Sequence, residues 1–408
     1  MSGTLVIRHG RVLVMGSTEL PARGREMREI GALDGCDVLI EGDRIVAVGR
    51  ELEAPAGART IDAAGRVVMP AFVDCHTHAC WAGDRLDEWE ARLGGASYLD
   101  ILEAGGGIMS TVRAVRAASE EELTDGLLGR LGRMLREGTA TVEVKSGYGL
   151  TTGDELKMLR AVRAAGERWA GTVVATACIG HAKDPDQDEF VRTTIEETLP
   201  AIHAEFPGIA IDAYCEKGAW SSDETRALLE RARELEHPIR LHSDQFHALG
   251  MTGWCARNGA VSVDHLEAST EEELEALAGS GTVGVVLPCS GFSVDGRYAD
   301  GRGLIDRGGA LAVATNLNPG SAPCWSMPMA VALAVRMNGI SAHEALTACT
   351  VNAAAVLGLG DRGRLQAGRR ADVIVLGHRD ERELAHSFGG NPVDVVVCGG
   401  EVVVDAGL

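Results

Sequence analysis

Residues 66–78, RVVMPAFVDCHTH, combine the two features on which the fold and the candidate site depend. The run is apolar almost throughout, which predicts a strand buried on both faces. It ends in His76 and His78, and side chains two residues apart on a strand point to the same face. Two imidazoles side by side are a candidate metal site, although a pair of solvent-facing histidines would give the same pattern.

Seven further apolar runs follow, and most gaps between them carry helical patterns such as SEEELTDGLLGRLGRMLREG and DETRALLERARELE. Near-continuous apolar strands that alternate with amphipathic helices indicate a parallel sheet covered on both faces. Eight such units fit a closed (β/α)8 TIM barrel, whose usual length is about 250 residues or more. An open doubly wound α/β sheet is the alternative, but only a barrel gathers all the strand ends around one mouth. The eight predicted strands are 66–78, 139–147, 171–181, 209–216, 238–244, 260–267, 282–290 and 310–316.

Both ends of the chain have a different pattern of apolar and polar residues. TLVIRHGRVLVMG and DVLIEGDRIVAVGR near the start, and PVDVVVCGGEVVVDAG near the end, alternate apolar and polar residues between glycine-containing breaks. This pattern is typical of antiparallel strands. We therefore expect residues 1–65 and 366–408 to form one small composite β-sandwich domain beside a barrel of residues 66–365.

The composition limits the partners. The 408 residues carry 39 basic and 59 acidic side chains, a formal net charge of -20, which argues against nucleic acid or an anionic membrane as a partner. The N-terminus lacks the apolar core of a signal peptide, and no apolar run reaches the ~18 residues of a membrane span. The ten cysteines are scattered without a CxxC pair, as expected for reduced thiols. These features indicate a cytoplasmic protein that acts on a small molecule.

Polar residues follow most predicted strands, where barrel enzymes build their active sites. His181 follows the third strand, while His242, His265 and Asn316 end the fifth, sixth and eighth. The HxH pair and His242 supply three neutral imidazoles, which suit zinc or ferrous iron better than magnesium. Such a metal would lower the pKa of its water to about 7 and provide a nucleophile at neutral pH. His181 and His265 would then bind substrate or carry protons, or they are hydrogen-bonded core histidines.

Three further features lie outside the strands. Arg85, shortly after the first strand, is either a fork for a substrate carboxylate or an ordinary surface arginine. NPGS, residues 318–321, is a turn that can hold a polar ligand or simply reverse the chain. EAGGGIMST, residues 103–111, lacks the Lys-Ser/Thr of a phosphate loop, and we interpret it as a flexible loop over the barrel mouth.

Longer motifs run through the same regions. They are HTHACWAGDRLDEWEARLGGASYLDILEAGGGIMSTVRAVRAAS, EVKSGYGLTTGDELKMLR, HSDQFHALG, SVDHLE and NLNPGS. In these motifs the chain resembles the imidazolonepropionases of the amidohydrolase superfamily, nearly from end to end. The resemblance implies the barrel and sandwich described above, and a homodimer. It also implies a hydrolase of histidine degradation that opens 4-imidazolone-5-propanoate with a metal-activated water to give N-formimidoyl-L-glutamate.

The resemblance also implies a role for each site residue. One Zn²⁺ or Fe²⁺/Fe³⁺ ion per chain would be bound by His76, His78, His242 and residue 316. Catalysis would involve His265, Gln245 and residue 316, with His265 polarising the ring carbonyl or carrying protons. The substrate, which bears a carboxylate, would be contacted by Arg85, Tyr148, His181, Gln245, Asn318, Gly320 and Ser321.

Position 316 departs from the family, which has aspartate where this chain has Asn316. An amide can offer a neutral oxygen to a metal, but it is no base near neutral pH. Three interpretations follow: His265 takes over as base, the residue was altered to trap a ligand, or the chain is a diverged homologue. A diverged homologue would be a non-hydrolytic isomerase, cyclase or dehydratase, or a binder of a related cyclic compound. Residues 79–81 and Cys289 also depart from the family, so that other cyclic amides or amidines with a carboxylate stay open as substrates.

Overall fold

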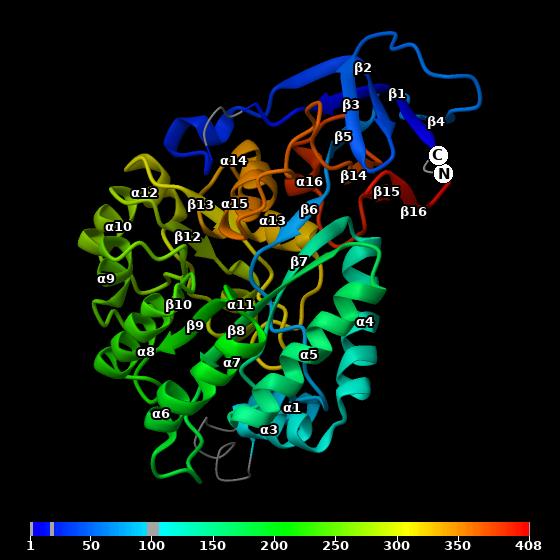
Figure 1. Cartoon of the computed structure of the whole chain (residues 1–408). Coiled ribbons are helices and arrows are strands. Elements are labelled where there is room, and N and C mark those ends of the chain that lie inside the picture. Colours follow the sequence, from blue (N-terminus) through cyan, green and yellow to red (C-terminus); the bar gives the residue numbers. More distant parts are fainter. Residues whose placement is uncertain (1–2, 17–19, 96–105, 408) are drawn as a thin grey trace.

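A parallel sheet of eight strands forms the centre of the computed structural model, which describes residues 3–16, 20–95 and 106–407 (Figure 1). Its strands neighbour one another in chain order, whereas a doubly wound sheet reverses its order at a switch point, so that alternative is wrong. The segments that follow the first and last strands meet as well, because the amide of Asn316 donates to the carbonyl of His76 at 3.1 Å and Thr77 pairs with Leu317 in a parallel bridge. The strands are β6 (Phe72–Asp74), β7 (Thr139–Lys145), β8 (Thr172–Gly180), β9 (Ala210–Cys215), β10 (Arg240–Ser243), β11 (Ser262–His265), β12 (Val283–Val286) and β13 (Leu311–Val313).

Helices cover the outside of this sheet, as the alternating pattern predicts (Figure 1). Four of them begin with a capping box, in which a Ser or Thr and the Glu three residues later satisfy each other's backbone amides. The longer helices are α1 (Leu86–Leu93), α3 (Ile108–Ala117), α4 (Glu120–Arg136), α5 (Thr152–Arg168), α8 (Ser222–Glu234), α10 (Glu271–Ala278) and α13 (Met327–Met337). The shorter ones are η1 (Gly24–Arg28), α6 (Phe190–Thr193), η2 (Thr194–Thr198), α7 (Leu199–Glu205), α9 (Met251–Arg257), α11 (Pro288–Val294), α12 (Gly301–Asp306), α14 (Ala342–Thr347), η3 (Ala348–Asn352), α15 (Ala353–Val356) and α16 (Glu383–His386).

Strands from both ends of the chain build a second, mixed sheet with its own apolar core. The order is β16-β15-β14-β5-β1-β2-β3, and β4 pairs with β1. Strands from the beginning and from the end of the chain share this one sheet, which confirms that the two ends of the chain meet in one β structure. The predicted domain bounds, 1–65 with 366–408 for the β domain and 66–365 for the barrel, stay a prediction. The strands are β1 (Thr4–Leu13), β2 (Ala32–Glu41), β3 (Arg44–Gly49), β4 (Arg59–Asp62), β5 (Val67–Pro70), β14 (Val373–Leu376), β15 (Val393–Cys398) and β16 (Glu401–Asp405).

The stretch 66–78 is not one strand. Its first half, β5, pairs with β1 and β14 in the terminal sheet, and its second half, β6, pairs with β7 in the barrel. The amide of Ala71 still donates to Asp372 of the terminal sheet, and the amide of Phe72 already donates to Gly138 of the barrel. Pro70 has no amide proton to continue the first ladder, which fits a change of partner at this point.

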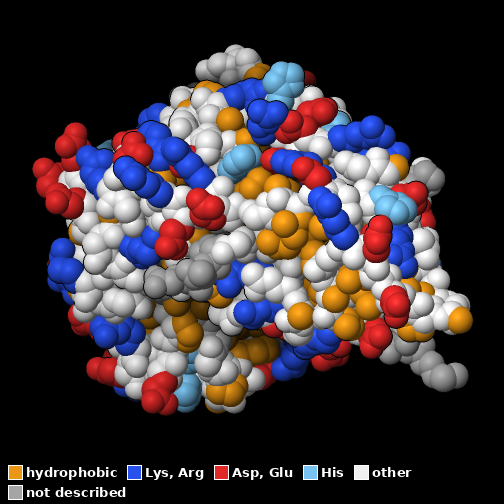
Figure 2. Space-filling model, turned by 90° about the horizontal axis from the view of Figure 1, so that it is seen from above, with side chains coloured by type: hydrophobic (Ala, Val, Ile, Leu, Met, Phe, Trp, Pro, Cys, Tyr) orange, Lys and Arg blue, Asp and Glu red, His pale blue; other side chains and the backbone are white. Residues whose placement is uncertain are grey.

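Two other sequence-based expectations concern loops and membranes. In the predicted loop 103–111, residues 103–105 lie outside the described residues, and Ile108–Thr111 begin helix α3 instead. Within residues 3–16, 20–95 and 106–407, no helix is both long and apolar enough to cross a membrane. On the face seen in Figure 2, basic and acidic side chains are interspersed and form no continuous basic surface.

Glu344 ties the N-terminal segment to the barrel through a buried carboxylate. It accepts from Arg28 of η1 at 3.0 Å, from Arg302 of α12 at 2.8 Å and from the amide of Ser341 at 2.6 Å. Burial alone would raise its pKa, but these bonds lower it to about 2. A carboxyl whose pKa falls on folding stabilises the protein above its unfolded pKa, and this contribution is lost as the pH falls from about 4.5 to about 2.

Replacing Glu344 with glutamine should therefore reduce the free energy of unfolding more at pH 7 than at pH 3. We expect a difference of about 1–2 kcal/mol, because the half-exposed Arg28 is partly screened by solvent. Urea unfolding at the two pH values measures it, with the exposed Glu275→Gln on α10 as control. An equal loss at both pH values would show that the carboxylate's charge is not what stabilises this junction.

Candidate active site

Three histidines converge at the carboxyl ends of the barrel strands. His76 and His78 follow β6, His242 lies in β10, and one ring nitrogen of each is within 4.8 Å of the others. The Nε2 atoms of His78 and His242 are only 3.1 Å apart, and the ring centroids of His76 and His242 are 4.5 Å apart. All three side chains are buried. Histidines on separate strands therefore share one centre, as a metal site requires.

Carboxylates behind the rings fix how two of these histidines face that centre. Nδ1 of His76 bonds Asp264 at 2.5 Å, and Nδ1 of His242 bonds Asp212 at 3.1 Å. A carboxylate accepts the Nδ1 proton, which leaves the Nε2 lone pair of each ring for the shared centre. Nε2 of His76 has no hydrogen-bond partner within the described residues.

The protonation states also suit a metal. Burial, reinforced by neighbouring cations, holds the pKa of His76 and of His78 well below the usual value, so both rings are neutral at pH 7. Neutral imidazoles whose free nitrogens face one another, with a buried nitrogen that lacks a partner among the described residues, form a donor set for zinc or iron. The residues present therefore fit such an ion.

A buried ionic network lies beneath the histidines and links the two carboxylates. Lys145 Nζ donates to Asp212 and to Glu143, both at 2.7 Å. Arg240 donates to the same Glu143 oxygen at 3.0 Å and to Asp264 at 2.7 Å. All five side chains are buried, and the chain of contacts runs unbroken from His76 to His242. Sequence reasoning missed most of this network, although charged residues at alternate positions of apolar strands are its signal.

Asn316 follows β13, after Ala314 and Thr315, and has a left-handed backbone (φ 56°), a conformation that Asn and Asp adopt more readily than most residues. Its amide donates to the carbonyl of His76, which places it beside the histidines. Its Oδ1 is buried without a hydrogen-bond partner among the described residues. An unpartnered buried oxygen on a residue that is hydrogen-bonded to the backbone of His76 is a fourth candidate ligand.

His181, Tyr148 and His265 surround the three histidines. His181 stacks on His78 with centroids 4.5 Å apart, and its Nδ1 bonds the carbonyl of Gly147 at 3.0 Å. Burial lowers the pKa of His181 to about 3, so the ring is neutral. The ring centroids of Tyr148 and His181 are 5.2 Å apart. Burial raises the pKa of the Tyr148 phenol, which stays a hydrogen-bond donor. The ring centroids of His265 and His242 are 5.7 Å apart, and Nδ1 of His265 bonds Glu267 at 3.1 Å.

The loop that carries Tyr148 is fixed by a buried carboxylate. Glu155 accepts from the amides of Gly147, Gly149 and Leu150 at 2.8–2.9 Å. A Cβ at Gly149 would lie 2.5 Å from the Glu155 nitrogen, and Gly147 has φ 108°, so neither position accommodates a side chain. These contacts explain the SGYG motif as a rigid support for the tyrosine.

A second group of predicted residues gathers at the 318–321 turn. Oδ1 of Asn318 accepts from the amides of Gly320 and Ser321 at 2.8 and 2.7 Å, and its Nδ2 donates to the carbonyl of Asn316 at 2.7 Å. The Nη1 atom of Arg85 fills the space that a Cβ on Gly320 would occupy. The turn therefore joins Arg85 to the segment that carries Asn316. Gln245 is half-buried, three residues after His242.

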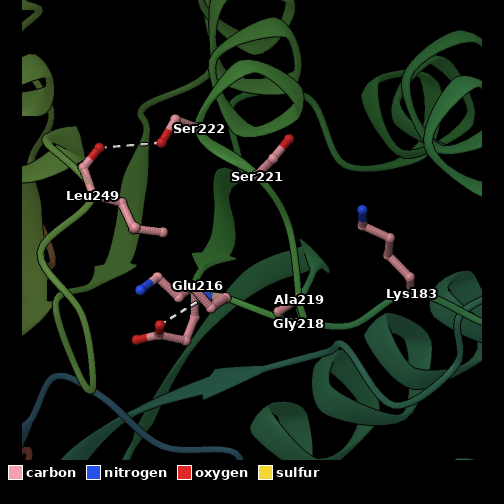
Figure 3. Close-up of a pocket in the computed structure, with 8 residues that line it drawn as sticks. Lys183, Glu216, Gly218, Ala219, Ser221, Ser222 and Leu249 are labelled. Atoms are coloured by element: carbon pink, nitrogen blue, oxygen red, sulfur yellow. Dashed lines mark hydrogen bonds between the residues drawn. The ribbon is translucent and has the colours of Figure 1, made fainter.

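The cavity drawn in Figure 3 is separate from this cluster. Its volume is about 510 Å³, and it lies between the loops that follow β8, β9 and β10. None of the site histidines lines it. Glu216, the acid at its wall, is already bonded by the amides of Lys217, Phe246 and His247. This cavity is therefore a different place from the centre at which the histidines converge.

Comparison with known proteins agrees with this architecture. A model of the amidohydrolase family matches residues 67–403. Imidazolonepropionase from Deinococcus radiodurans is 45% identical over 383 residues, covering 93% of this chain and 95% of the relative. Imidazolonepropionase from Herpetosiphon aurantiacus is 42% identical, covering 98% and 96%.

Solved structures share the fold at low sequence identity. A triazine hydrolase variant superposes with a TM-score of 0.78 at 20% identity, covering 99% of this chain and 95% of that one. Atrazine chlorohydrolase from Arthrobacter aurescens, complexed with zinc, gives 0.70 at 19% identity, covering 98% and 95%. The chain therefore belongs to the amidohydrolase family of metal-dependent hydrolases. Within that family it belongs with the imidazolonepropionases, the amidohydrolases of histidine degradation.

Proposed function

We propose that the protein opens the ring of 4-imidazolone-5-propanoate with water to give N-formimidoyl-L-glutamate. The observation that carries this proposal is the shared centre of three buried imidazoles. One Zn²⁺ or Fe²⁺/Fe³⁺ ion would be held by His76, His78, His242 and the Asn316 oxygen. Bound there, the ion acts as a Lewis acid and lowers the pKa of a water molecule to about 7.

The remaining side chains would orient the ring and move protons. His265 is the residue we assign to proton transfer, because Glu267 holds its Nδ1 and leaves Nε2 free to act. Asn316 cannot share that task, since an amide is no base near neutral pH. His181 and Tyr148 would bind the ring as neutral groups, and Gln245 would contact it from the end of β10.

The carboxylate of the substrate would bind at the 318–321 turn. Arg85 would provide a guanidinium group, and Asn318, Gly320 and Ser321 would provide the polar turn around it. Guanidinium groups bind carboxylates through paired, charge-assisted hydrogen bonds, which fix orientation as well as affinity. This arrangement supports a ring substrate with an acidic side chain.

A diverged homologue is the second candidate. It would act as a non-hydrolytic isomerase, cyclase or dehydratase, or bind a related cyclic compound without turnover. The observation in its favour is the amide at position 316, which brings no negative charge and no base to the site.

The two candidates are distinguished by turnover in ¹⁸O-labelled water. Protein loaded with zinc or iron is incubated with 4-imidazolone-5-propanoate, and the products are followed by mass spectrometry. Hydrolysis should give N-formimidoyl-L-glutamate that carries one labelled oxygen. An unlabelled isomer, or tight binding without turnover, would overturn the proposal in favour of the diverged homologue.

We also propose a cytoplasmic homodimer. The ten cysteines are all free thiols, which is the state that a reducing compartment maintains. Mass determination by light scattering during gel filtration tests the homodimer directly, and a monomer mass would exclude it.

A further inference from the structure

Helix α1 places two charged side chains, Glu88 and Arg92, on its inward face. Glu88 and Arg92 are its only positions that are not exposed, and Arg85, which precedes the helix, is half-buried as well. Leu86, Trp89 and Leu93 are 66%, 52% and 70% exposed. A surface helix normally turns its apolar side toward the protein. The inversion indicates that the inward face of α1 recognises something polar.

The Arg85 guanidinium is already largely engaged. Its Nε donates to Glu88 at 2.9 Å, and its Nη2 donates to the other oxygen of the same carboxylate. Its Nη1 packs against Gly320. These hydrogen bonds lower the pKa of Glu88 against the effect of burial, so the carboxylate is charged and balances Arg85.

Arg92 reaches the same turn, and no carboxylate among the described residues forms an ion pair with it. Its Nη2 lies 3.4 Å from the carbonyl of Gly320, and its Nε is buried without a hydrogen-bond partner among the described residues. Glu88 is paired with Arg85, so Arg85, Glu88 and Arg92 together carry a net charge of about +1. A buried donor without a partner is rare in folded proteins and points to a missing acceptor.

We propose that Arg92 binds the carboxylate of the substrate together with Arg85 at the 318–321 turn and selects substrates that carry this group. The inference rests on the proposed function for the identity of the ring. Arg85 offers its remaining nitrogen, Nη1, and Arg92 offers Nε and the charge that no carboxylate among the described residues neutralises. A planar carboxylate satisfies both, since each of its oxygens accepts from a different guanidinium.

The test compares Arg92→Gln with Arg92→Lys on two substrates, the propanoate and its propanamide, which has the same shape without the charge. Arg92→Gln should lower kcat/KM for the propanoate about 10- to 100-fold, the effect of losing one charge-assisted hydrogen bond. The loss should appear mainly in KM. The propanamide should change by less than about threefold, and Arg92→Lys should recover part of the loss because it keeps a charge. Glu90→Gln, on the exposed side of α1, is the matched control.

Equal losses on both substrates would overturn the proposal, because they indicate a structural role for Arg92. Unchanged kinetics in Arg92→Gln would overturn it as well. Calorimetric binding of the propanoate and the propanamide keeps the test independent of turnover. If neither compound is hydrolysed but only the propanoate loses affinity in Arg92→Gln, the proposed function fails and the role of Arg92 stands.

Discussion

Replacing His76 with alanine is expected to remove the metal and to lower kcat/KM for ring opening by about 10⁴-fold or more. His76 is in ring contact with both His78 and His242, and it is also the partner of Asp264. Its loss therefore removes one ligand and leaves a buried carboxylate with one bond fewer. Metal content by mass spectrometry and steady-state kinetics measure the two effects on the same preparation.

A histidine pair elsewhere in the chain provides the control. His203 and His237 bond each other at 3.0 Å, and neither belongs to the candidate metal cluster of His76, His78 and His242. His203→Ala should keep both metal and activity. If His76→Ala retained a full equivalent of metal and normal turnover, the three histidines would not be the metal site and the proposed mechanism would fail.

Replacing Asn316 with aspartate is expected to raise both metal occupancy and rate. Aspartate tolerates the left-handed backbone of Asn316, and the Oδ1 position has no partner in the described structure that the change would disturb. The new carboxylate adds a negative ligand and a general base, and such a base contributes about 10²–10⁴ in rate. Metal titration and kcat at pH 7 measure the gain.

Asn318→Asp makes the same chemical change two residues further on, where Oδ1 already accepts from two backbone amides. We expect no gain in metal from it. The wild-type protein could already hold one full equivalent of metal, and the Asn316→Asp variant could be no faster. That result would show that the amide of Asn316 suffices for metal binding and for turnover. In that case His265 alone would account for proton transfer.

The sequence predicted the strands and the histidines because their signals are local. All eight barrel strands lie within the predicted runs, since a parallel strand buried on both faces reads as an uninterrupted apolar segment. His76, His78 and His242 were apparent because barrel strands end at a common mouth. The fold class is confirmed by the strand order and by the family match.

What the sequence did not reveal depends on contacts between distant segments. Arg240 of β10 meets Asp264 on the neighbouring strand β11 and Glu143 on the more distant strand β7, because the closed sheet brings these side chains together inside it. The division of 66–78 into β5 and β6 follows from the partners of each half, which no local pattern specifies. In the sequence alone, Arg92 resembles any exposed arginine on a helix. Only the structure shows that its side chain lies on the inward face of α1.

The change of sheet at Ala71 has a consequence for how the protein should be handled. Only a few residues separate β5, clamped between β1 and β14, from the first two imidazoles after β6. Strain applied to the terminal sheet, whether from a fused tag, a trimmed C-terminus or partial unfolding, should therefore be transmitted along this short peptide to the candidate metal site. Retention of the ion should thus report on the integrity of a part of the molecule that performs no chemistry itself.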